Sequence, residues 1–115
     1  AASALISDLH ASGRLDKTLV AIMGDFGRTP KINGGAGRDH YPYAFSTVLA
    51  GGGIRGGQVY GSSDSIGAYP HDLACGPNDV HATIFQALGI PPDSTLHDNL
   101  NRPHAICDGR PLPLF

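Results

Sequence analysis

The sequence predicts an α/β protein in which a few strands with flanking helices are connected by long loops. Two segments have the spacing of amphipathic helices, and an apolar run typical of a buried strand lies between them. Sixteen glycines and nine prolines among 115 residues, with no repeat, indicate that loops make up much of the chain. Because this length fits one domain at most, we treat residues 1–115 as a single segment.

The first helix is predicted over residues 3–12. Leu5, Ile6 and Leu9 fall on one face of this segment. Gly13 follows where helices commonly end in a left-handed residue.

A strand is predicted over residues 18–23. This run is apolar rather than alternating, which favours a strand buried on both faces of a helix-covered parallel sheet. A loop is expected over 27–43, and a second strand over 45–50 before three consecutive glycines.

The second half of the chain is expected to hold one long helix. A short strand is predicted over 58–60, an irregular stretch over 61–77, and a helix over 79–88 with Asn78 as its N-cap. Prolines at 91, 92, 103, 111 and 113 predict little regular structure near the C-terminus.

Two main strands form a poor sheet on their own, because an isolated strand pair is marginally stable in water. We therefore expect the chain to be the C-terminal segment of a larger domain, with the N-terminal remainder of the same protein as its partner. The alternative is a self-contained fold that completes its sheet by homo-oligomerisation.

Charge and hydropathy exclude two classes of partner. The net charge is −2, and the eight basic residues form no stripe beside aromatic residues, so we expect no nucleic-acid binding. No stretch approaches the roughly 20 apolar residues of a membrane span. Cys75 and Cys107 fit no zinc spacing, and the sequence leaves open whether they pair or remain free thiols.

Asp25 is the sharpest candidate for a functional residue. It follows the first predicted strand, between glycines that let the backbone turn steeply. Ligands of open α/β sheets bind beyond the carboxyl ends of strands, where a carboxylate is well placed to hold a divalent cation. A lone aspartate in a turn more often bonds its own backbone, so the neighbouring loop decides the interpretation.

That loop carries four further candidates before the second strand. His40 is a candidate imidazole ligand, and Asp39 is a second ligand or orients one. Arg38 and Arg28 are candidates for bidentate contacts to a sulfate or phosphate oxyanion. Together these residues predict a metal site at one edge of the sheet.

Two other motif matches fail. Asp25-Phe26-Gly27 has the letters of the magnesium loop of protein kinases, but no histidine-arginine-aspartate loop precedes it. The glycine-rich stretch 51–57 lacks the lysine of a phosphate-binding loop and opens no helix.

The motifs, in this order, resemble the C-terminal part of a sulfatase-like family of exported bacterial proteins, domain-of-unknown-function family 1501, related to the alkaline phosphatase superfamily. The resemblance is carried by Thr18–Val20, Gly24–Pro30, Gly37–Pro42, Leu49–Gly57, Tyr60–Gly61 and Asp79–Ile84. It implies a partial alkaline-phosphatase-like layered fold with a mostly parallel sheet, and a periplasmic or extracellular location.

The resemblance also implies a function for the site. Asp25 and His40 match an aspartate and a later histidine that bind a divalent metal in that superfamily, whether zinc, calcium, magnesium or manganese. Phe26 stands where the superfamily has a paired histidine, which removes one ligand. The nucleophile belongs to the N-terminal portion, so this chain alone is expected to be inactive.

Two functions follow as hypotheses. The first is a portion of a metal-dependent hydrolase that acts on small sulfate or phosphate esters. The second is a non-catalytic binding or scaffold module of the same fold that has lost a complete metal site.

Overall fold

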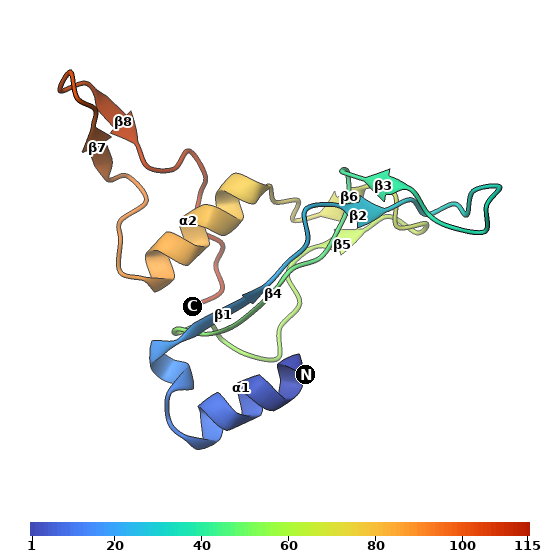
Figure 1. Ribbon diagram of the computed structural model, residues 1–115, viewed down its shortest axis with the longest axis horizontal. Coiled ribbons are helices and arrows are strands. Elements are labelled where there is room, and N and C mark those ends of the chain that lie inside the picture. Colours follow the sequence, from blue (N-terminus) through green and yellow to red (C-terminus); the bar gives the residue numbers. More distant parts are fainter. The chain divides into compact units, whose positions relative to one another are not determined.

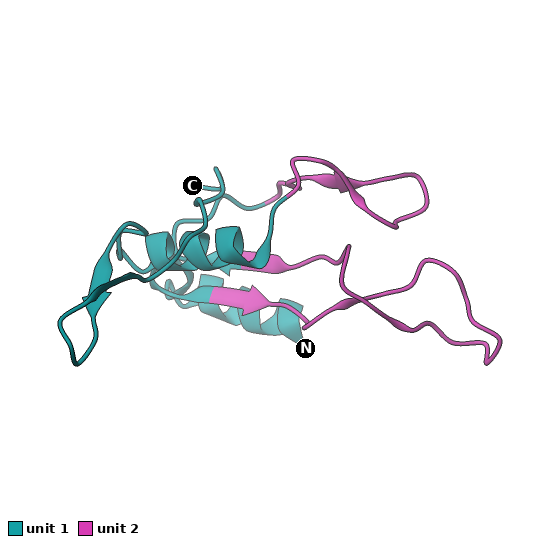
Figure 2. Ribbon diagram, turned by 90° about the horizontal axis from the view of Figure 1, so that it is seen from above, with its two compact units in different colours: residues 1–19, 50–56, 75–115 teal, residues 20–49, 57–74 magenta.

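A computed structural model describes residues 1–115, which form two α-helices, one short 3-10 helix and eight strands (Figure 1). The chain is divided into two compact units. Unit 1 comprises residues 1–19, 50–56 and 75–115, and unit 2 comprises residues 20–49 and 57–74 (Figure 2). The mixed α/β class is therefore confirmed. Neither helix is long and apolar enough to cross a membrane.

Helix α1 (Ala2–Ala11) confirms the first predicted helix. Ile6 and Leu9 are half-buried, whereas Leu5 on the same predicted face is 51% exposed. Gly13 follows the helix at a φ of 68°, as its position predicted. The 3-10 turn η1 (Leu15–Lys17) then leads into the first strand.

Strands β1 (Leu19–Ile22) and β4 (Val48–Gly51) lie where strands were predicted and form a two-stranded sheet. The prediction that β1 is buried on both faces was wrong, because Leu19 and Val20 are half-buried and the next two residues are exposed. Burial on both faces needs helix layers or further strands, and this sheet has two strands only. A mostly parallel sheet was predicted, whereas β2–β3, β5–β6 and β7–β8 are each antiparallel pairs.

Helix α2 (Pro77–Ala87) begins two residues earlier than predicted, and its N-cap is Gly76 rather than Asn78. The carboxylate of Asp79 explains the earlier start, because it accepts the N–H of Gly76 at 2.9 Å. Pro77 then occupies a first-turn position where its missing N–H costs nothing.

The buried core of unit 1 surrounds α2. Val80, Ala82 and Thr83 of the helix are buried together with Leu114 near the C-terminus. Thr83 is fully buried, and its hydroxyl donates to the carbonyl of Asp79 at 2.6 Å and accepts the N–H of Leu112 at 2.9 Å. These two hydrogen bonds offset the cost of removing the hydroxyl from water.

Residues 107–112, which we call the C-terminal clamp, lie along the first turns of α2. The thiol of Cys107 donates to the carbonyl of Asn78, and the N–H of Arg110 donates to Asp79 at 2.9 Å. A side chain at Gly109 would overlap the backbone of Asn78, so only glycine fits this approach. Cys75 and Cys107 are both free thiols in this structure.

The C-terminal region contains more regular structure than its prolines predicted. Strands β7 (Thr95–His97) and β8 (Pro103–Ala105) form an antiparallel hairpin. The carboxylate of Asp98 organises the turn, because it accepts the N–H groups of Leu100 and Arg102 and the guanidinium of Arg102. Pro103 is tolerated because it begins a strand of a hairpin with free edges.

Unit 2 contains two short antiparallel pairs in stretches predicted to be irregular. Strands β2 (Gly27–Arg28) and β3 (His40–Tyr41) pair within the predicted loop, and β5 (Ser62–Ser63) pairs with β6 (Pro70–Asp72). The strand predicted over 58–60 is absent, and Val59 is 93% exposed. Such two- and three-residue strands have too few alternating positions to be recognised from their sequence.

Asp64 closes the turn between β5 and β6. Its carboxylate accepts the N–H groups of Ala68 at 2.7 Å and Tyr69 at 3.2 Å. Ala68 is the buried residue of unit 2. These bonds lower the pKa of Asp64, with the Ala68 bond as the largest cause.

Candidate metal and anion site

The pairing of β2 with β3, which we call the β2–β3 ribbon, brings the two ends of the 27–43 segment together. Gly27 lies opposite Tyr41, and Arg28 lies opposite His40. A side chain at Gly27 would overlap the carbonyl of Ala44, so glycine is what permits the chain to approach so closely here. The ribbon therefore places His40 beside the segment that follows Asp25.

One face of the ribbon carries a stack of three side chains. The rings of Phe26 and His40 lie 3.8 Å apart between centroids and are tilted by 26°. The guanidinium carbon of Arg28 lies 5.6 Å from the centre of the Phe26 ring. Strand alternation explains the arrangement, since residues 26 and 28 share a face and His40 is the cross-strand partner of Arg28.

Asp25 lies on the surface directly before this stack. Its carboxylate is exposed and forms no hydrogen bond or ion pair within the chain. Asp64, Asp79 and Asp98 differ, because backbone N–H groups occupy their carboxylates and lower their pKa values. Asp25 is thus a carboxylate without the structural task that a turn aspartate commonly has.

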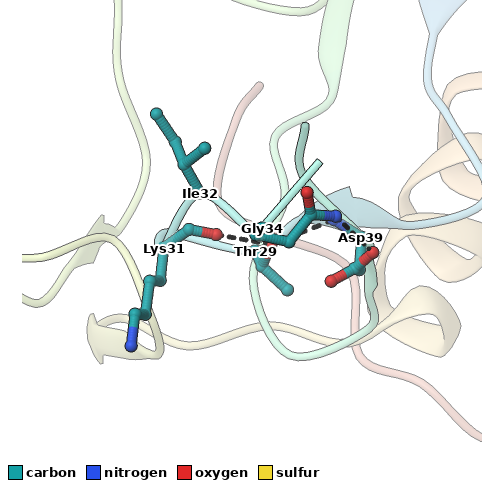
Figure 3. Close-up of a pocket in the computed structure, with 6 residues that line it drawn as sticks. Thr29, Lys31, Ile32, Gly34 and Asp39 are labelled. Carbon is teal, nitrogen blue, oxygen red and sulfur yellow. Dashed lines mark hydrogen bonds between the residues drawn. The ribbon is translucent and has the colours of Figure 1, made fainter. Parts of the chain in front are cut away.

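Asp39 has a clear structural role in the loop. It accepts a hydrogen bond from the amide of Asn33 at 2.9 Å, and its N–H donates to the hydroxyl of Thr29 at 3.1 Å (Figure 3). The side-chain oxygen of Asn33 in turn accepts the N–H groups of Gly35 and Gly37. These bonds hold the tip of the loop in one shape.

An open hollow of about 420 Å³ lies within this loop (Figure 3). Its lining residues come from the two arms of the loop: Thr29, Lys31, Ile32, Asn33, Gly34 and Asp39. Neither Asp25 nor His40 borders it, so the hollow does not coincide with the predicted metal ligands.

The two candidate arginines differ in their partners. One guanidinium nitrogen of Arg38 donates to the carbonyls of both Thr29 and Pro30, with the Thr29 bond at 2.7 Å. Arg28 donates to the carbonyl of Arg38 at a longer 3.3 Å and lies over Phe26. Arg38 therefore braces the loop, while Arg28 belongs to the stack beside His40.

The predicted ligands do not form a complete metal cage. No group of three or more histidine, cysteine, aspartate or glutamate side chains in the chain is arranged to hold a metal ion. Asp25 and His40 both belong to the segment around the ribbon, and one carboxylate with one imidazole is a donor set that zinc and manganese accept. Two donors do not complete the coordination of such an ion.

Tyrosines form a second surface feature of unit 2 that the sequence did not indicate. Tyr41 meets Tyr43 edge-on at 5.2 Å and Tyr69 at 6.3 Å between ring centroids. Partial burial and a hydrogen bond with Tyr69 raise the pKa of Tyr41 to about 12. The three tyrosines are 28 residues apart in sequence at most, with no shared period that could have revealed them.

The other histidines take no part in this site. His104 lies 3.3 Å from the carboxylate of Asp98 in the C-terminal hairpin, a partner that the sequence did not predict. His71 and His81 are exposed on β6 and α2. The spacing of residues in the sequence predicted the segment that contains the ribbon, but it did not predict the contact between His104 and Asp98.

Comparison with known proteins now places the chain in a family. The family model DUF1501, a protein family of unknown function, matches residues 1–113. The chain belongs to this family. No curated protein and no solved structure gives a significant match. DUF1501 membership thus agrees with the motif order, and a family of unknown function assigns no activity to the chain.

Proposed function

We propose that this DUF1501 chain is the C-terminal portion of a metal-dependent hydrolase of small sulfate or phosphate esters. In this proposal, Asp25 and His40 contribute two ligands to one divalent cation, and the N-terminal remainder contributes the nucleophile and the other ligands. The chain alone would then be inactive. The related proposals of an alkaline-phosphatase-like layered fold and of export rest on the same motif resemblance.

The observation that carries the proposal is the β2–β3 ribbon. Sequence separates Asp25 from His40 by a long loop, and the pairing of Arg28 with His40 returns the imidazole to the residues next to Asp25. His40 stacks on Phe26, the residue directly after Asp25. Asp25 is an exposed carboxylate with no internal partner, and it directly precedes Phe26, the ring on which His40 stacks, which supports a metal-binding role for this segment.

We assign the ester oxyanion to Arg28 rather than to Arg38. The guanidinium of Arg28 lies in the stack with His40, whereas that of Arg38 is held by two loop carbonyls. A cation and a guanidinium side by side repel each other unless an anion lies between them. A dianionic sulfate or phosphate ester would satisfy both charges, which supports this substrate class. Asp39, bonded by Asn33, would orient the loop rather than bind the metal.

The second candidate is a binding or scaffold module that has kept the fold and lost the metal. It is favoured by Phe26 at the place of a second imidazole, and by a donor set of fewer than three side chains. Metal analysis of purified full-length protein separates the two candidates. A bound stoichiometric cation supports the hydrolase, and its absence supports the scaffold.

The test of the hydrolase is ester turnover by full-length protein and two variants. We expect Asp25→Ala and His40→Ala to abolish metal-dependent hydrolysis of aryl sulfate or aryl phosphate esters, because each removes one of the ligands. Asp8→Ala, which removes an exposed carboxylate of α1, is the matched control and should leave turnover unchanged. If Asp25→Ala and His40→Ala turn over the esters as fast as wild type and the control, the site assignment is wrong.

A further inference from the structure

Asn33 is followed by Gly34 at the tip of the loop between β2 and β3, and both residues are exposed. Only the main-chain carbonyl carbon, Cα and Cβ of Asn33 separate the backbone nitrogen of Gly34 from the side-chain amide carbon. Rotation about the bonds of Asn33 therefore brings these two atoms together, and glycine has no side chain to obstruct the approach. The covalent structure thus keeps a nucleophile within reach of an electrophile.

The main-chain N–H of Gly34 sets Asn33 apart from the other asparagines of the chain. It donates no hydrogen bond, so solvent can reach it and remove its proton. The residues that follow the other three asparagines differ, because their N–H groups all donate hydrogen bonds that would have to break first. They are Asp79, Leu100 and Arg102. Asn33 alone is followed by both a glycine and a free N–H.

The loop also polarises the side-chain amide of Asn33. Its oxygen accepts the N–H groups of Gly35 and Gly37, each at 3.0 Å. When a nucleophile attacks the amide carbon, negative charge develops on this oxygen, and donors already directed at it stabilise that charge. The two N–H groups that shape the loop tip therefore also favour attack on the amide.

We propose that Asn33 is a site of spontaneous deamidation in the folded protein. The nitrogen of Gly34 loses its proton to water and bonds to the amide carbon of Asn33, whose bond to Nδ2 breaks so that ammonia leaves. Water then opens the resulting cyclic imide to aspartate or isoaspartate. The inference is independent of the proposed function, because neither a metal nor an ester takes part.

Deamidation releases the tip of the loop. The amide of Asn33 donates to the carboxylate of Asp39 at 2.9 Å, and the product has a carboxylate oxygen in place of this donor. Two carboxylates side by side repel each other. Isoaspartate also adds a methylene group to the main chain, next to the bond from the N–H of Asn33 to the carbonyl of Gly37. The hydrogen bonds that hold the tip in one shape are therefore lost.

The experiment is incubation of full-length protein at physiological temperature and pH, followed by peptide mapping with mass spectrometry. We expect the peptide that contains Asn33 to gain the mass of an amide-to-acid exchange and to separate into aspartate and isoaspartate forms, while the other asparagines stay unchanged. Gly34→Ala should slow the reaction several-fold, because the methyl group obstructs the attack. Alanine fits this position, since Gly34 has no positive φ and an added Cβ meets open space. Asn33→Gln keeps an amide on a longer side chain and should show no mass gain.

Three results would overturn the proposal or its consequence. Equal rates of mass gain in wild type and Gly34→Ala would overturn attack by the Gly34 nitrogen. The same incubation in concentrated urea tests the folded loop: we expect the folded protein to react at least as fast as the unfolded chain, and a reaction confined to urea would show that the loop protects Asn33. Hydrogen exchange at Gly35 and Gly37 should become faster in the deamidated fraction, and unchanged exchange would overturn release of the loop tip.

Discussion

The C-terminal clamp on α2 and the β2–β3 ribbon both present polar side chains, but these groups are hydrogen-bonded at the clamp and exposed at the ribbon. Where the clamp meets α2, the carboxylate of Asp79 and the hydroxyl of Thr83 are both occupied by backbone partners, and Thr83 has no exposed surface. At the ribbon, His40 is exposed apart from its stack, and Asp25, just before the ribbon, has no partner within the chain. Satisfied polar groups stabilise a fold, whereas ordered polar groups left at the surface are available for a ligand.

Backbone hydrogen bonds identify the aspartates that have a structural role. Asp64, Asp79 and Asp98 each accept two or more hydrogen bonds from the backbone, and each has a lowered pKa. Asp25 also lies in a turn, between Gly24 and Gly27, and has no such bonds. Hydrogen-bond partners therefore identify the structural aspartates, whereas the position of Asp25 between β1 and the β2–β3 ribbon is what selects it as the candidate ligand.

The largest expected effect is on the clamp. Thr83→Val keeps the size of the side chain but leaves the N–H of Leu112 without an acceptor in a buried place, and should lower the free energy of unfolding by about 1–3 kcal/mol. Thr83→Ser keeps the hydroxyl and should lose less. Urea denaturation measures both. If Thr83→Val unfolds at the same urea concentration as wild type while His40→Ala unfolds at a lower one, the ribbon rather than the clamp stabilises the fold.

A smaller effect is expected from Asp79, and it depends on pH. Hydrogen bonds from Arg110 and Gly76 lower its pKa, so the ionised carboxylate stabilises the fold above the pKa of the unfolded chain. This stability is lost as the pH falls through the lower pKa of the folded state. Asp79→Asn should cost about 1 kcal/mol near neutral pH, since solvent screens the partly exposed group.

The matched control for Asp79 is Asp8→Asn, whose carboxylate lies exposed on α1. Denaturation midpoints between pH 7 and pH 3 should converge for wild type and Asp79→Asn at the acid end, and the control should follow wild type throughout. A constant gap between wild type and Asp79→Asn down to pH 3 would show that ionisation of Asp79 does not contribute.

The longest elements could be predicted from the sequence, and the short ones could not. Apolar periodicity located α1 and α2, and apolar runs located β1 and β4, because each spans enough residues to show a pattern. The strands of the ribbon have two residues each, so only the long-range pairing of Gly27 with Tyr41 defines them. The N-cap of α2 was missed because the capping carboxylate lies three residues inside the helix, at Asp79.

The candidate site was predictable as a set of residues and not as a geometry. Strand-end position selected Asp25, and the loop composition selected His40, Asp39, Arg28 and Arg38. Residue types alone do not separate Arg38, held by loop carbonyls, from Arg28, stacked on Phe26. The contact between Phe26 and His40 depends on strand register, which residue types alone do not specify.

In the proposed function, the side chains of Asp25 and His40 bind one cation. Paramagnetic broadening by Mn²⁺ tests it most directly, because the effect falls steeply with distance from the ion. At substoichiometric Mn²⁺ we expect the nuclear magnetic resonance signals of Asp25, Phe26 and His40 to broaden together, ahead of those of Asp64, Asp79 and Asp98. Broadening that reaches Asp25 but leaves His40 sharp would contradict a shared cation.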